Sequence, residues 1–257
     1  MVGEGEVAVA RLCGCVSRCP RCDGSGFERT IVDGSETLER CTCFHVERVL
    51  QRYCRTKIPA RMARKHLSNF DFSLVSTRVV STTSRYINDF VLGEMNRGLV
   101  LYGDVGRGKT HLMAAMVRSL VVEHGVTARF VEFSHLLADL KSSFGRGGGA
   151  ANLIEPLVKV DVLAIDELGK GRNTEFEGTV LDELVSRRYN AGRTILATTN
   201  YQPGPSTGLS TPDFTTGKRP ALTDRVGDRV YSRLCEMCEM LPMEGTDYRQ
   251  TIVGSRR

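Results

Sequence analysis

A short glycine-rich run carries the clearest chemistry in this chain of 257 residues. Residues 103–110 read GDVGRGKT, which fits the spacing G-x-x-x-x-G-K-[ST]. In such a loop, backbone N–H groups surround the phosphates of a nucleotide at the start of a helix. Lys109 is expected to reach the β- and γ-phosphates, and the Thr110 hydroxyl is expected to bind Mg²⁺. The predicted nucleotide-binding residues are Gly103, Gly106, Arg107, Gly108, Lys109, Thr110 and His111.

Two carboxylates follow another apolar run, and they are candidates for the Mg²⁺ ligand and the general base of nucleotide hydrolysis. The run from Val160 to Ile165 is followed directly by Asp166 and Glu167. At the end of a strand, Asp166 can hold the Mg²⁺ shell together with Thr110. Glu167 can polarise the attacking water as a general base. A third run, TILATT, ends at Asn200, which is well placed to orient that water.

The elements that must position these residues can be predicted from the flanking patterns. Residues 99–102 are a short apolar run before the loop, and apolar residues recur at helical spacing over 112–120 after it. A further amphipathic helix over 180–189 ends near Gly192. Strands that alternate with helices indicate an α/β fold with a parallel sheet.

The cysteines gather in a different part of the chain. Seven of the nine fall within residues 13–54. Four of these seven form two close pairs, Cys19 with Cys22 and Cys41 with Cys43. The pairs flank the segment RTIVDGSETLER, which is typical of a hairpin with its turn at Asp33-Gly34. Four thiolates around zinc form a closed tetrahedral structural site. The predicted zinc ligands are Cys19, Cys22, Cys41 and Cys43.

Two other interpretations of the cysteines stay open. Cys13 and Cys15 supply spare thiolates, so an iron–sulfur cluster is one alternative. The other is a set of reduced cysteines in a small apolar core. His45 is a further spare ligand, so the assignment of individual ligands is also open.

Composition limits the class of protein. The chain is 41% hydrophobic and 25% charged, with a net charge of +5, which permits an acidic partner without requiring one. No apolar run is long enough to span a membrane, and acids stand where a secretory signal carries basic residues. We therefore expect a cytoplasmic protein, in which cysteines bind metal more often than they form disulfides.

A basic segment links the cysteine-rich part to the phosphate loop. Residues 44–53 have helical periodicity, Ile58-Pro59 interrupts it, and a second short helix is expected after the break. The excess of arginine and lysine over 48–65 suits DNA phosphates or an acidic protein surface. A solvated helix face is the plainer explanation of the same pattern.

In order and content, these motifs resemble the AAA+ ATPases of the bacterial helicase-loader and IstB type (DnaC/DnaI-like). The resemblance runs from about Leu99 to Arg249, through LYGDVGRGKTHL, FVEFSHLLADL, LAIDELG, LDELVSRRYNAGRTILATTN, DRVYSRL and GTDYR. Loader relatives also carry the patterns CPxC-x-GxG, C-x-C and an Ile-Pro pair before the ATPase motifs, as this chain does. IstB-type helpers usually lack these paired cysteines. The resemblance implies a zinc-binding and helical docking region over 1–66. It also implies an AAA+ P-loop NTPase domain over 67–257, whose parallel sheet is sandwiched by helices.

The resemblance also implies roles for single residues. Lys109, Thr110, Asp166 and Glu167 match the two Walker motifs, and Asn200 matches the sensor at the end of a strand. Arg229 in DRVYSRL matches an arginine finger that acts on a neighbouring subunit, and Arg249 in DYR matches the second sensor. The implied cofactors are ATP, Mg²⁺ and Zn²⁺, and self-association is expected through the ATP sites.

Three functions are compatible with this reading. The first is an ATP-hydrolysing loader of the replicative DNA helicase on single-stranded DNA. The second is an IstB-like helper that recruits a transposase to DNA, and the third is a nucleotide-dependent adaptor with negligible hydrolysis.

Two segments depart from the family pattern. Residues 200–230 are expected to form a long mobile loop. The run KSSFGRGGGAAN is either a contact to single-stranded DNA through Lys141, Phe144 and Arg146 or a plain glycine loop.

Overall fold

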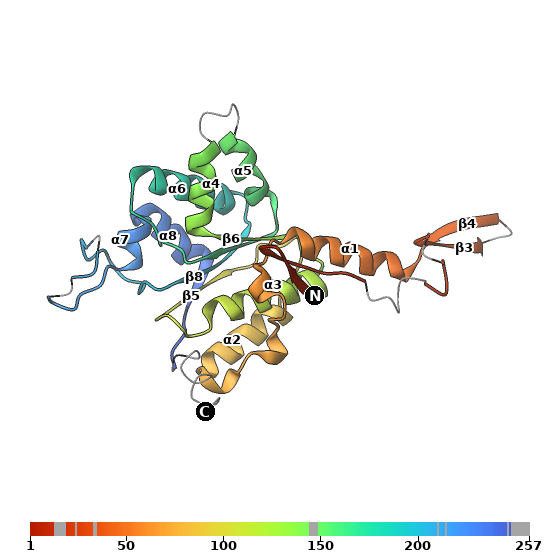
Figure 1. The fold of residues 1–257 in the computed structure, drawn as a ribbon, viewed down its shortest axis with the longest axis horizontal. Coiled ribbons are helices and arrows are strands. Elements are labelled where there is room, and N and C mark those ends of the chain that lie inside the picture. The colour runs from red at the N-terminus through yellow and green to blue at the C-terminus, as the bar shows by residue number, and fades with distance from the viewer. Residues whose placement is uncertain are drawn as a thin grey trace. The chain divides into compact units, whose positions relative to one another are not determined.

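The computed structural model describes residues 1–12, 19–23, 25–32, 35–143, 149–209, 211–213, 215–245 and 247. The chain divides into two compact units, unit 1 over Met1–Arg64 and unit 2 over Lys65–Arg257. Figure 1 shows the elements of both units in chain order. The assignment of functions to 1–66 and 67–257 stays a prediction, and each unit is described by itself.

Unit 2 is built on a parallel sheet, as predicted. Within the described residues, five strands lie in the order β6-β7-β8-β5-β9, and each neighbouring pair is parallel. The strands are β5 (Gly98–Tyr102), β6 (Ala128–Glu132), β7 (Val162–Asp166), β8 (Thr194–Thr199) and β9 (Cys238–Pro242). Because the strands are parallel, β5, β7 and β8 all end at the same edge of the sheet. The phosphate loop, Asp166 and Asn200 therefore meet there.

Helices cover both faces of this sheet (Figure 1). The helices of unit 2 are α2 (Thr77–Asn88), α3 (Lys109–Glu123), α4 (Phe133–Ser143), α5 (Gly149–Lys159), α6 (Glu175–Asn190), α7 (Leu222–Val226) and α8 (Asp228–Met237). Helices α2 and α3 lie on one face, and α4, α5, α6 and α8 lie on the other. Leu112, Val117 and Leu120 of α3 are completely buried, which explains why the helix after the loop is apolar on several sides. The central strands β7 and β8 are buried along their whole length, whereas the edge strands β6 and β9 are partly exposed.

Strand β9 was not predicted from the sequence. Its segment CEMLP is short and follows α8 almost directly, yet it pairs with β5 from Gly98↔Cys238 to Tyr102↔Pro242. Gly98 makes the close approach possible. A Cβ at Gly98 would lie 2.0 Å from the carbonyl oxygen of Ile195 and 2.8 Å from Sγ of Cys238.

The described residues of unit 1 form two hairpins, one α-helix and a short 3-10 helix. Strands β1 (Val2–Glu4) and β2 (Val7–Val9) pair antiparallel, and so do β3 (Phe27–Val32) and β4 (Ser35–Arg40). The second pair is the predicted hairpin, while its turn residues Asp33 and Gly34 lie outside the described residues. Helix α1 (Thr42–Arg55) follows.

The predicted second helix after Ile58-Pro59 is only a 3-10 turn over Ala60–Met62. The reason is local. The N–H of Ala8 donates to the Ile58 carbonyl at 2.7 Å, and Pro59 forms a bridge with Val7. This strand-like pairing uses the backbone that a helix would need, and proline removes a donor.

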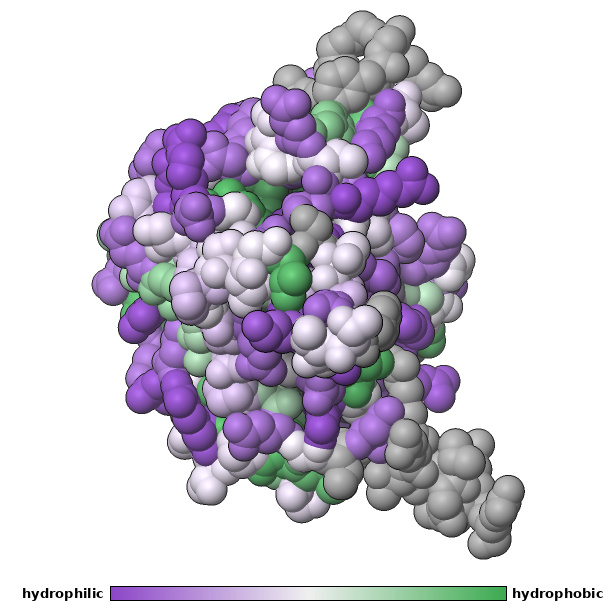
Figure 2. Space-filling view, turned by 90° about the vertical axis from the view of Figure 1, so that its left-hand side faces the viewer, coloured by the Kyte–Doolittle hydropathy of each residue, from purple (hydrophilic) through white to green (hydrophobic). Residues whose placement is uncertain are grey.

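The described helices are all too short or too polar to cross a bilayer. Hydrophilic side chains predominate on the side of unit 2 that carries α7 and the segment after β8, with small hydrophobic areas scattered between them (Figure 2).

Candidate functional site

The phosphate loop joins the end of β5 to the first residue of α3. Gly103, Gly106 and Gly108 have φ values of 141°, 85° and 79°, which side chains rarely tolerate. A Cβ at Gly106 would lie 2.1 Å from a carboxylate oxygen of Asp247, and one at Gly108 would lie 3.1 Å from the Phe70 ring. The loop ends at the N-terminus of α3, a helix of fifteen residues. The free backbone N–H groups at a helix N-terminus favour the binding of an anion.

Lys109 lies across the loop. Its Nζ donates to the carbonyl oxygens of Gly103 and Asp104, both at 2.7 Å. Burial lowers the pKa of Lys109 to about 8, although the nearby carboxylates of Asp166 and Asp104 act in the opposite direction. The ammonium group is thus held by two carbonyl oxygens of the loop itself.

Asp166 is the centre of a buried hydrogen-bond network at the end of β7. Its Oδ1 accepts from Thr110 Oγ1 at 2.9 Å and from Thr198 Oγ1 at 2.5 Å. Burial raises the pKa of Asp166, and the two hydroxyl hydrogen bonds oppose this effect. A divalent cation beside Thr110 and Asp166 would remove the cost of burying this carboxylate, so the donor set suits Mg²⁺.

Glu167 has a strained backbone. Its φ is 56°, in the left-handed region, and its N–H donates to Thr198 Oγ1 at 3.0 Å. The next N–H, of Leu168, donates to the Thr198 carbonyl at 2.7 Å. Such strain is typical of residues whose side chains must face a site. The Glu167 carboxylate forms a short ion pair with Lys170.

A cavity of about 620 Å³ lies next to Glu167. Its polar wall is formed by Asp104, Glu167, Lys170, Asn200 and Arg219. Asn200 follows directly after β8, so the structure brings the predicted water-orienting residue and the predicted general base to one cavity.

Of the two predicted arginines, Arg229 is not part of this cluster. Arg229 is exposed on α8 and forms an ion pair of 3.7 Å with Asp182 of α6. Arg249 lies outside the described residues. An exposed arginine on α8 is compatible with a finger that acts on another chain, and its role stays a prediction.

His111 contacts the segment before α2. Its Nε2 lies 3.2 Å from Oδ1 of Asn69, and its ring packs edge-on against Phe70 at 5.1 Å. Burial, followed by repulsion from Lys65, lowers the pKa of His111 to about 4, so the ring is neutral at pH 7.

Sequence reasoning missed several residues of this site. In the sequence, Thr198 is only one residue of a predicted strand, although its side chain links Asp166 to the Glu167 backbone. Phe70 was also missed, and it covers the loop at Gly108. The sequence shows Thr198 among the threonines near the end of TILATTN, and Phe70 as one of the two aromatic residues in NFDF. Neither pattern shows by itself which element it contacts.

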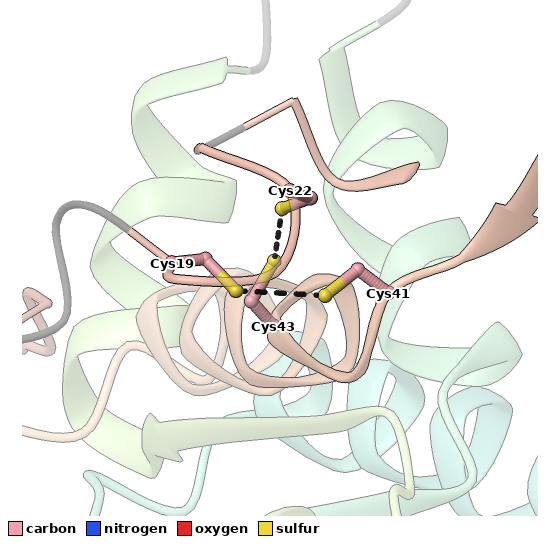
Figure 3. A group of neighbouring side chains, drawn as sticks. All are labelled: Cys19, Cys22, Cys41 and Cys43. Atoms are coloured by element: carbon pink, nitrogen blue, oxygen red, sulfur yellow. Dashed lines mark hydrogen bonds between the residues drawn. The ribbon is translucent and has the colours of Figure 1, made fainter. Parts of the chain in front are cut away.

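The four predicted zinc ligands meet in unit 1. Their sulfurs point toward one another in Figure 3, with Cys19 and Cys22 on one loop and Cys41 and Cys43 at the start of α1. The Sγ atoms of Cys19 and Cys41 are 3.5 Å apart, and those of Cys22 and Cys43 are 3.3 Å apart. All four lie within 4.8 Å of one another. Tetrahedral zinc with bonds of about 2.3 Å places sulfurs about 3.8 Å apart, so the cluster fits this ion.

Nearby groups also favour thiolates around a cation. The N–H of Gly26 donates to Sγ of Cys22 at 3.3 Å, and the N-terminus of α1 lies at Cys41 and Cys43. With no ion, the hydrogen bond to Cys22 is the main effect that raises the pKa of Cys43 to about 12. Crowded thiols of this kind lose their protons when a divalent ion binds them. The alternative ligands Cys13 and Cys15 lie outside the described residues.

Comparisons with known proteins find an ATP-binding family and related proteins. The model of the family described as IstB-like ATP binding protein matches residues 35–252. A replicative helicase loader DnaC of Buchnera aphidicola subsp. Acyrthosiphon pisum is 28% identical over 180 residues, which are 69% of this chain and 66% of that protein. A Mycobacterium tuberculosis protein named as ATP-binding in an insertion sequence is 28% identical over 156 residues, 61% of this chain and 57% of that protein.

Among solved structures, a DnaC helicase loader is 26% identical with a TM-score of 0.59, over 72% of this chain and 99% of that one. The predicted AAA+ P-loop fold and the resemblance to the loader and IstB type are thereby confirmed. The matched regions span less than two thirds of the curated relatives. The activities and partners of those whole proteins therefore come to this chain only as proposals.

Proposed function

The chain belongs to the IstB-like ATP-binding protein family, and on this basis we propose that unit 2 binds Mg²⁺–ATP and hydrolyses it. The observation that carries the proposal is the buried Thr110–Asp166–Thr198 network beside the phosphate loop. Lys109 would bind the β- and γ-phosphates, and Thr110 and Asp166 would hold Mg²⁺. Glu167 would accept a proton from a water molecule that Asn200 orients.

The cellular task proposed for this ATPase is the loading of a replicative DNA helicase on single-stranded DNA. Two findings support it: the DnaC loaders among the relatives, and the cysteine cluster that precedes the ATPase unit. The second candidate is an ATP-dependent helper that recruits a transposase. The family model and the relative from an insertion sequence favour this candidate.

Unit 1 is proposed to dock the partner, with zinc as the group that holds its fold. A four-thiolate shell leaves no open coordination position, so the ion would be structural. The hairpin held by the cluster has an unusual surface: Ile31 and Leu38 are 76% and 70% exposed. Leu38 pairs with Arg29, two residues from Ile31, so the two apolar side chains and one arginine lie on one face. The same face also carries Glu36, which pairs with Ile31 and lies 3.9 Å from Arg29. An apolar face with charges of both signs at its rim suits a partner surface that has an apolar patch of its own.

Capture of the purified host helicase by full-length protein tests this proposal. Leu38→Glu should abolish capture, whereas Thr37→Glu, on the opposite face of the same strand, should leave it nearly unchanged. The wild-type protein should also transfer the helicase to circular single-stranded DNA when ATP is present. Capture of a transposase instead of the helicase would favour the second candidate.

The metal has its own test. Wild-type protein should contain about one zinc per chain, and a Cys19→Ser, Cys22→Ser double variant should contain none. Because a site this small depends on metal for its folding, unit 1 of the variant should become sensitive to protease. Unit 2 has its own core and should still bind ATP. Zinc-free wild-type protein with a folded unit 1 would contradict the assignment.

A further inference from the structure

The segment between β8 and α7 is shorter than the predicted loop over 200–230, because α7 begins at Leu222 and α8 begins at Asp228. Hydrogen bonds tie its two ends together in unit 2. The N–H of Leu222 donates to the Gln202 carbonyl at 2.8 Å. The carboxylate of Asp224 accepts from the N–H of Ala221 at 2.7 Å and from the N–H of Thr207 at 2.9 Å. Asp224 thus ties the outgoing and returning parts of the segment together at the start of α7. The two ends of the segment, at 202–208 and at Ala221, are therefore held at the start of α7.

This anchoring places Arg219 against the phosphate loop. Nη1 of Arg219 lies 3.3 Å from Oδ1 of Asp104, the second residue of the loop. Arg219 also lines the 620 Å³ cavity that contains Glu167 and Asn200. A guanidinium group therefore stands on the wall of the cavity where the predicted general base and the predicted sensor meet.

Asp104 makes this cation chemically significant. A carboxylate in a phosphate-binding loop repels the triphosphate unless cations neutralise it. Arg107 lies 3.6 Å from its other oxygen, so Asp104 has an arginine on each side. The contact to Arg219 is a solvent-exposed ion pair with side chains 75% and 60% exposed, a type that contributes little to stability. Its guanidinium still has free donors and can exchange this partner for phosphate oxygens, which it binds in a fork.

We propose that Arg219 binds the γ-phosphate of the ATP held by its own chain and thereby lets the protein distinguish ATP from ADP. The inference rests on the proposed nucleotide site of unit 2. The proposal gives the segment between β8 and α7 a function, because this segment positions the Arg219 guanidinium at the nucleotide site of the same chain. Arg229 on α8 lies outside this cavity and remains the candidate that acts on a neighbouring chain.

Nucleotide affinity tests this assignment without requiring hydrolysis. Fluorescent ATP and ADP analogues are titrated into full-length wild-type protein, Arg219→Ala and Lys218→Ala. Loss of a charge-assisted hydrogen bond should weaken ATP binding by roughly tenfold or more. ADP binding should change by less than about twofold, because ADP has no γ-phosphate. Lys218→Ala removes the same charge from the adjacent exposed residue and should leave both affinities unchanged.

A second comparison separates γ-phosphate binding from simple neutralisation of Asp104. Arg219→Ala is introduced into an Asp104→Ala background. If Arg219 only neutralises Asp104, its loss has no effect there. Contact with the γ-phosphate instead predicts the same loss of about tenfold in both backgrounds. Equal weakening of ATP and ADP, or a loss that disappears with Asp104→Ala, would overturn the assignment. If wild-type protein binds ATP but never hydrolyses it, the proposed ATPase activity fails while these affinities still decide the role of Arg219.

Discussion

Raising the pH from 7 to 9 should weaken ATP binding through one side chain, Lys109. Burial lowers the pKa of this lysine to about 8 in the nucleotide-free protein, from an ordinary value of 10.5. Phosphates beside Nζ favour the ammonium form, so the pKa rises again when ATP binds. The affinity that depends on this charge is therefore nearly complete at pH 7 and is lost as the pH rises through 8.

The size of the effect follows from linkage. The apparent dissociation constant for ATP is multiplied by the ratio of total Lys109 to protonated Lys109 in the nucleotide-free protein. With a pKa of about 8, this ratio is about 1.1 at pH 7, about 2 at pH 8 and about 11 at pH 9. ATP binding should therefore be about tenfold weaker at pH 9 than at pH 7. The phosphate itself titrates near pH 6, below this range.

Titration calorimetry with the full chain measures this dependence and the proton taken up on binding. Two controls isolate Lys109. AMP lacks the phosphates that Lys109 contacts, and Lys109→Arg keeps its charge over the whole range, so neither should show the pH effect. An ATP affinity that is constant from pH 7 to 9, or an equal decline for AMP, would refute the reasoning.

Three further predictions concern other parts of unit 2. The Arg229→Ala variant should bind ATP normally and hydrolyse it poorly. If the arginine acts across a subunit boundary, mixing this variant with Lys109→Ala protein should restore part of the turnover. No recovery of turnover at any mixing ratio would contradict this prediction. Thr198→Val removes the hydroxyl that donates to Asp166, so turnover measured at limiting Mg²⁺ should fall by about tenfold while the fold is kept, and unchanged turnover would argue against the network. Arg188 is completely buried and donates to five backbone carbonyls, so Arg188→Ala should lower the free energy of unfolding in urea by about 3–5 kcal/mol. Arg187→Ala, which removes partly exposed ion pairs, should lower it far less.

The residues that were predictable from sequence belong to short, local patterns. The loop at 103–110 needs particular residue types within eight positions, and the flanking strand and helix have strong periodicity. Asp166 and Glu167 follow a buried strand directly, and each cysteine pair is separated by one or two residues. In such patterns, chain connectivity alone brings the groups together, so one sequence is enough to predict them.

The residues that were missed depend on contacts between distant segments. Arg219 and Asp104 are 115 positions apart, and nothing in either segment indicates that they meet. Thr198 is ordinary in a strand and gains its role only because β8 pairs with β7. Strand β9 is too short for its own periodicity and is defined by its neighbour β5. Each of these needed the tertiary arrangement.

The central claim is that the cluster at the ends of β5, β7 and β8 binds ATP and hydrolyses it through Glu167. Single-turnover hydrolysis and ATP affinity, measured side by side for wild-type protein, Glu167→Gln and Lys109→Ala, test it most directly. Glu167→Gln keeps the size of the side chain and removes only the base. It should bind ATP as well as the wild type does and hydrolyse it at least about a hundredfold more slowly, while Lys109→Ala should fail to bind. Unchanged hydrolysis in Glu167→Gln, or an equal loss of binding in both variants, would contradict the account.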